Sequence, residues 1–132
     1  MSHSLSWLGR IGSGPKRRQD ATAYSGDTLS VTVTVKDDTN TAIDLTGATA
    51  EWRVCELLAS GAHGTAEITL TTAAGVMLSD PTNGQLTLSI AASETDDLDG
   101  VYVHELQITD SSGAVSTVST GRLTVKNDLV TP

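Results

Sequence analysis

The sequence predicts an all-β protein: an antiparallel β-sandwich of about seven strands with an extended N-terminal arm. Three observations predict this fold class. Apolar and polar residues alternate with a period of two in several short runs, residues typical of turns gather between the runs, and helical periodicity is confined to short stretches. A length of 132 residues is that of one domain with a core of its own.

The clearest strand lies at residues 28–36, TLSVTVTVK. Its odd-numbered residues from Leu29 to Val35 are apolar, and hydroxyl-bearing residues stand between them. Because successive side chains of a strand point to opposite faces, one face of this strand is apolar and the other is hydroxyl-rich. The same alternation predicts further strands around residues 48–54, 66–70, 86–90, 102–108 and 123–125.

Turn-forming residues separate these runs, at positions 37–40, 60–64, 80–84 and 110–113. Residues 52–59 also fit a helical stripe, but the alternation through 48–54 favours a strand. Residues 93–96, SETD, resemble a capping box and predict one helical turn before Gly100. Since no long helix is available as a crossover connection, we expect antiparallel strands.

The composition excludes several classes of protein. With one cysteine, Cys55, the chain forms no internal disulfide and no cysteine-based zinc site, and we expect a small, buried or half-buried side chain there. No run of 18 apolar residues occurs, so we predict no membrane partner. The first residues lack the apolar stretch of a secretion signal. The net charge of −8 argues against a nucleic-acid partner, because phosphate contacts need a cationic surface.

The first 20 residues differ from the rest of the chain. They hold four of the eight basic residues, whereas residues 19–132 hold 4 basic against 16 acidic residues, a balance of −12. We therefore divide the chain into an extended docking arm, 1–20, and a sandwich, 21–132. Burying Trp7 or Leu8 against another chain would contribute about 2–3 kcal/mol each. The residues expected to bind a partner are Leu5, Trp7, Leu8, Arg10, Ile11, Lys16, Arg17 and Arg18.

Candidate catalytic and metal-binding groups are few. Residues 94–99 form the densest acidic cluster, which could offer some calcium ligands but lacks the spacing of an EF-hand loop, so we expect a solvated turn. His3, His63 and His104 are not spaced as metal ligands, and we expect His104 to be a hydrogen-bonded histidine of the core or its rim. No nucleophile elbow, phosphate loop or zinc-protease motif occurs. We predict no enzymatic activity, catalytic residue, metal, cofactor or small-molecule substrate.

Two places in the sequence resemble immunoglobulin-like domains. Trp52 lies in mid-strand, where such sandwiches place a core indole. Residues 98–104, LDGVYVH, place Tyr102 two residues after Gly100 at the start of a late strand, as in a tyrosine corner. Antibody domains carry a cysteine two residues after that tyrosine, where this chain has His104. The resemblance therefore implies an immunoglobulin-like sandwich without the disulfide.

A tighter resemblance is to small virion proteins of tailed phages. The segments GDTLSVTVTVKDDTNTAIDLTGATAEWRV, NGQLTLSI and DGVYVHELQITDSSGAVSTVSTGRLTV are similar, in this order, to the N-terminal domain of upper baseplate proteins and to related immunoglobulin-like modules of phage heads and tails. The match covers residues 24–126. It implies a non-enzymatic structural protein of the virion, assembled in the host cytoplasm. Its partners would be capsid or tail and baseplate subunits and further copies of itself, in a decoration or adaptor role.

Three other interpretations stay open. The arm could be a frayed terminus that its basic residues keep soluble. A carbohydrate- or cell-surface-binding sandwich would need an exposed aromatic platform, for which the body offers Tyr24, Trp52 and Tyr102, two of them expected inside. A nucleic-acid-facing protein would use Arg10 and the basic residues 16–18 to reach phosphates while its acidic body stays away.

Overall fold

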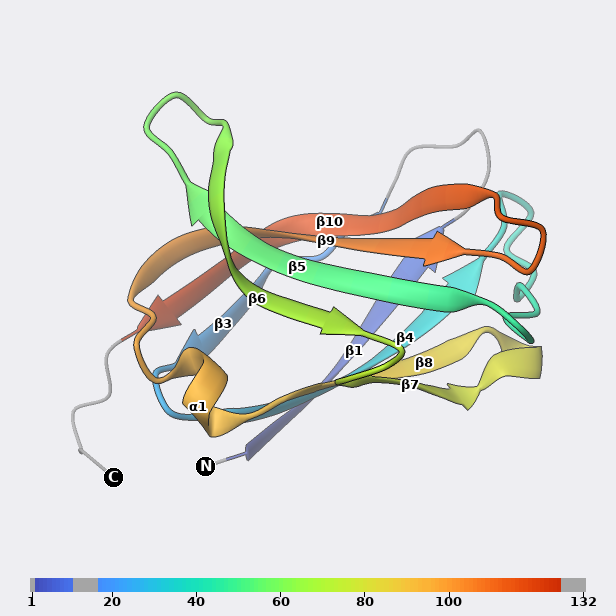
Figure 1. The fold of residues 1–132 in the computed structure, drawn as a ribbon, viewed down its shortest axis with the longest axis horizontal. Helices are drawn as coiled ribbons and strands as arrows, with labels where there is room; N and C mark the ends of the chain where they lie inside the picture. The colour runs from blue at the N-terminus through green and yellow to red at the C-terminus, as the bar shows by residue number, and fades with distance from the viewer. Residues whose placement is uncertain (1, 11–16, 127–132) are drawn as a thin grey trace.

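The computed structural model describes residues 2–10 and 17–126. These residues fold into two stacked β-sheets with one short α-helix and one 3-10 turn (Figure 1). The strands are β1 (Ser2–Arg10), β2 (Arg17–Arg18), β3 (Ala21–Tyr24), β4 (Thr28–Lys36), β5 (Thr49–Leu57), β6 (His63–Thr71), β7 (Val76–Asp80), β8 (Gln85–Ile90), β9 (Gly100–Thr109) and β10 (Val115–Lys126). The 3-10 turn covers Pro81–Asn83 and the helix α1 covers Ala92–Thr95.

The strand order identifies the architecture. One sheet has the order β1-β4-β8-β7, and the other has the order β2-β10-β9-β5-β6, with β3 also pairing with β10. From β4 to β10, all pairs between strands are antiparallel. This is the strand order of an immunoglobulin-like sandwich, so the predicted all-β sandwich is confirmed.

The strands predicted from alternation are present. Residues 28–36 form β4, and its apolar face, from Leu29 to Val35, lies in the core with at most 2% of each side chain exposed. Residues 49–57 form β5, so the strand that we favoured over a helix for this segment is confirmed. Trp52 of this strand is fully buried. The predicted helical turn is α1, where the Glu94 carboxylate accepts a hydrogen bond from the Ala91 N–H at 3.0 Å.

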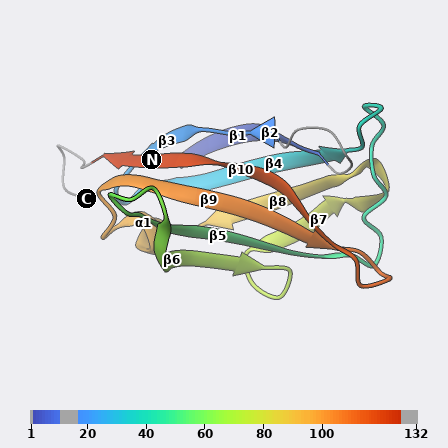
Figure 2. The ribbon, with the colours of Figure 1, turned by 90° about the horizontal axis from the view of Figure 1, so that it is seen from above.

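The N-terminal segment differs from the docking arm that we predicted. β1 pairs in parallel with β4 over nine residues, and β2 and β3 pair in parallel with β10. Seen from above in Figure 2, these three strands lie along one side of the sandwich and β6 lies along the opposite side. The expectation that residues 1–20 stand apart from the sandwich is therefore wrong for residues 2–10 and 17–18.

The N-terminal strand joins the sandwich because it closes a side of the core that would otherwise be open. Without β1, strand β4 would present an unpaired edge and the core would be open between β4 and β10. β1 closes this side: Leu5, Trp7 and Gly9 face inward, Ser6 and Leu8 face outward. An edge strand that both completes a ladder and covers apolar surface is more stable in place than in solvent.

Candidate binding surfaces

The N-terminal strand is held by a cluster of three rings. Trp7 is 8% exposed and stacks on His104 of β9, with ring centroids 4.6 Å apart and an interplanar angle of 8°. Trp52 lies against both rings, with centroids 6.2 Å from Trp7 and 5.7 Å from His104. The cluster thus joins β1 to two central strands of the opposite sheet.

Both ring nitrogens of His104 are used. The Trp52 indole N–H donates to Nδ1 at 3.3 Å, and an indole nitrogen can only donate, so Nδ1 is the acceptor. Nε2 then carries the proton and donates to the Gln19 carbonyl oxygen at 2.5 Å. Burial lowers the pKa of His104, against smaller opposing effects of the Gln19 carbonyl and the Asp20 carboxylate. The prediction of a hydrogen-bonded core histidine is confirmed.

The segment that follows β2 continues alongside β10, with the Gln19 carbonyl against Gly121. The Gln19 N–H donates to the Thr120 carbonyl at 2.7 Å, and the Arg122 N–H donates to the Asp20 carboxylate at 2.9 Å. Gly121 lies between these contacts, and a Cβ there would overlap the Gln19 carbonyl oxygen. This close approach is the reason for a glycine in the middle of β10. Our reading of the sequence missed Gln19 and Gly121, although a glycine inside a strand pattern signals such an approach.

The structure separates the eight residues predicted to bind a partner. For Trp7 the prediction is wrong, because its ring is buried in the protein's own core. Leu5 is half-buried and packs against that core, and Leu8 is half-buried on the outer face, opposite Thr34 of β4. Three of the remaining residues are placed through their backbone alone: Arg10 beside Lys36, Arg17 beside Ser119 and Arg18 beside Thr120. Ile11 and Lys16 lie outside the described residues.

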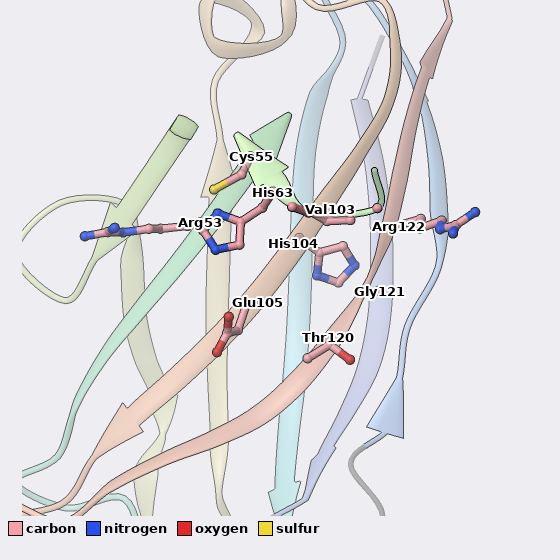
Figure 3. A pocket seen from close by; sticks show the side chains of 11 residues that line it. Arg53, Cys55, His63, Val103, His104, Glu105, Thr120, Gly121 and Arg122 are labelled. Carbon is pink, nitrogen blue, oxygen red and sulfur yellow. The ribbon is translucent and has the colours of Figure 1, made fainter. Parts of the chain in front are cut away.

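A shallow groove lies on the outer face of the sheet that contains β5, β9 and β10. It has a volume of about 420 Å³, and Cys55, Val103 and Thr120 are among the residues that line it. Figure 3 shows the Arg53 and Arg122 side chains pointing away from it to opposite sides. Charged groups surround the groove: Arg53 pairs with Glu51 at 2.6 Å, and Glu105 accepts a hydrogen bond from Thr117 at 2.9 Å.

The outer face of the other sheet is different in character. We call it the hydroxyl face and define it by the outward side chains of β1, β4, β8 and β7. Its central row runs across all four strands through directly paired residues, Ser6, Thr32, Thr87 and Met77. The neighbouring rows are formed by Leu8, Thr34 and Gln85 and by Ser30 and Ser89. Of these residues, none carries a charge.

The segment that holds the acidic cluster, 94–99, is tied to the sandwich by Thr95 and Tyr102. The buried Thr95 hydroxyl donates to the Asp27 carbonyl at 3.0 Å and accepts from the Gly26 N–H at 3.1 Å, which ties α1 to the start of β4. The Tyr102 hydroxyl accepts from the Asp99 N–H at 3.0 Å, as a tyrosine corner does. Among the described residues, no group of three or more His, Cys, Asp or Glu side chains is arranged to hold a metal ion.

Comparisons with known proteins show a likeness in fold. No protein-family model and no curated protein sequence matches the chain. Among solved structures, the chain is similar to one titled "N-terminal domain of phage TP901-1 ORF48", with a TM-score of 0.60 and 10% sequence identity over 94% of this chain and 99% of that one. It is also similar to a structure of the fibronectin(III)-like modules of Clostridium thermocellum CbhA, with a TM-score of 0.41 and 15% identity over 87% and 93% of the two chains. In the described part of the chain, no helix has the length and apolar character needed to cross a membrane.

Proposed function

We propose that the protein is a non-enzymatic structural subunit of a tailed-phage virion, which joins neighbouring capsid or tail and baseplate subunits. The observation that carries this proposal is the likeness in fold to a phage domain, which extends over nearly the whole of both chains. It supports the resemblance to phage virion modules that the sequence shows in residues 24–126. The proposal of a non-enzymatic role is supported by His104, whose two ring nitrogens are both hydrogen-bonded inside the core and so are engaged in the fold.

In the docking role that we propose for the N-terminal segment, the residues that contact a neighbour differ from those predicted from the sequence. Trp7 fixes β1 inside its own sandwich, so it cannot be buried in a neighbour at the same time. The residues left for docking are the basic ones, Arg10 and residues 16–18. Of these, Arg10 lies on β1, and Arg17 and Arg18 lie on β2, at one side of the sandwich. We propose that they pair with carboxylates of a neighbouring subunit, which improves orientation and association rate more than affinity.

The carbohydrate-binding alternative loses support. It needs an aromatic platform, yet Trp52 is fully buried and the Tyr102 hydroxyl bonds to the backbone of its own chain. Tyr24, which is 43% exposed, is the described aromatic side chain that reaches solvent most fully. A single ring is a poor platform, so we keep the structural role.

The test is incorporation into particles. We expect the wild-type protein to remain with gradient-purified phage particles and the double variant R17E/R18E to be depleted at least tenfold. R122E/K126E is the matched control, because it makes the same change in charge at two exposed residues of β10 and should leave incorporation unchanged. Absence of the wild-type protein from particles would contradict the virion role. Equal incorporation of R17E/R18E would contradict the docking role of the basic residues alone.

A further inference from the structure

We propose that the hydroxyl face is a self-association surface, on which a second copy of this chain packs sheet against sheet. The proposal goes beyond the virion role and does not depend on it. Negative charge is distributed unevenly between the two sheets. All carboxylates except Asp128 fall in the described residues, and on the four strands of this sheet the only one is Asp80, at the end of β7.

This distribution matters because the chain carries a net charge of −8. Two copies repel each other wherever their carboxylates approach within about 8 Å, the screening length at physiological salt. The outer face of the other sheet carries Glu51 and Glu105, and the loops at the ends carry Asp37, Asp44 and Asp110. The hydroxyl face therefore allows the approach of a second copy at the lowest electrostatic cost.

The edges of the face are complementary to each other. Met77, on the edge strand β7, is 62% exposed, and Leu8 is half-buried on the opposite edge strand β1. A two-fold axis parallel to the strands would place β7 of one copy over β1 of the other, and β4 over β8. Each Met77 would then cover Ser6 and Leu8 of the second copy. Asp80 would approach the end of the second copy's β1, where Arg10 lies beside Lys36.

The size of the face suits a weak dimer. Four strands about 4.8 Å apart, five to nine residues long with a rise of about 3.3 Å per residue, cover roughly 450–500 Å² per copy. The total of roughly 1,000 Å² lies at the low end of specific interfaces. Aligned sheets pack well at this geometry, and short Ser and Thr side chains let two sheets approach closely. We therefore expect association at high concentration, as among the crowded copies of a particle.

Sedimentation equilibrium of the wild-type chain tests the proposal. Between about 10 μM and 1 mM the average mass should rise from 13.7 kDa toward twice that value. The variant T32R, at the centre of the face, should stay at the monomer mass. T69R is the matched control, because it places the same side chain at an exposed position of β6, and it should associate as the wild type does.

A thermal melt of each variant checks that the fold is kept. If T32R melts earlier than the wild type, S89R on the neighbouring strand repeats the test. A wild-type chain that stays at 13.7 kDa up to 1 mM overturns the proposal. So does a folded face variant that associates as strongly as the wild type, or equal disruption by T69R. None of these results depends on incorporation into particles, so the proposed self-association and the proposed virion role can fail independently of each other.

Discussion

β1 and β4 lie side by side in one sheet and have the same length, yet they owe their positions to different interactions. In β4, four consecutive inward positions from Leu29 to Val35 are apolar, so the strand packs along its whole length. In β1, the buried inward positions are Trp7 and Gly9, and the Trp7 ring stacks on His104 of the opposite sheet. A strand with few buried inward positions can therefore be held in place by one aromatic side chain that packs on rings of the opposite sheet.

Removal of the Trp7 side chain should cost the most stability. W7A should lower the free energy of unfolding by about 3–5 kcal/mol, because it deletes a buried aromatic side chain and leaves a cavity beside His104. L8A is the matched control, since Leu8 is the half-buried outward neighbour on the same strand, and it should cost less than about 1 kcal/mol. Urea denaturation measures both. Equal costs would mean that Trp7 is no anchor.

A second substitution tests the contact between Gln19 and β10. G121A should lower the free energy of unfolding by about 1–3 kcal/mol, because the added Cβ overlaps the Gln19 carbonyl and pushes Gln19 away from β10. G64A is the control, because the Cβ added there meets mainly the flexible Glu56 and Leu58 side chains. A G121A variant as stable as the wild type would show that the Gln19 carbonyl does not lie against Gly121.

The third effect is a dependence on pH. Because burial lowers the pKa of His104 in the folded protein, the unfolded chain binds the additional proton first as the pH falls. The stability from the neutral ring is therefore fully present above pH ~6.5, the unfolded value, and is lost below it, with a slope of at most about 1.4 kcal/mol per pH unit. Urea denaturation from pH 7.5 to 5 measures this slope. H104Q should remove it, whereas H63Q, at an exposed residue, should retain it.

The smallest effect concerns a turn far from the cluster. The Asp110 carboxylate accepts hydrogen bonds from the Ser112 hydroxyl and the Ala114 N–H, and these bonds lower its pKa. D110N should speed amide hydrogen exchange in residues 111–114 while changing the melting temperature little, because the group is fully exposed. The control D96N, at another exposed residue, should leave that exchange unchanged. Unchanged exchange in D110N would mean that the carboxylate does not order the turn.

Much of the body could be predicted from the sequence. Alternation alone located β4, β5, β8 and β9, because each strand has one face in the core and one in solvent, and residues 28–36 already showed the hydroxyl-rich side of β4. β7 was missed because it is five residues long and its pairing is irregular.

The N-terminal side could not be predicted in the same way. The partners of Trp7 are Trp52 and His104, which lie far away in the sequence, so no local pattern reveals the contact. The excess of basic residues in the first 20 positions is real, but a difference in charge does not determine which side chains are buried. The clue available was Gly121, whose missing side chain implies that another segment passes close by.

Acrylamide quenching of the wild-type protein tests whether the N-terminal strand is part of the sandwich and is held there by Trp7. The chain has two tryptophans, Trp7 and Trp52. Because both rings are buried, we expect both to be protected, with blue-shifted emission and quenching far weaker than that of free tryptophan. Emission in which one of the two residues is quenched as readily as free tryptophan would contradict this expectation.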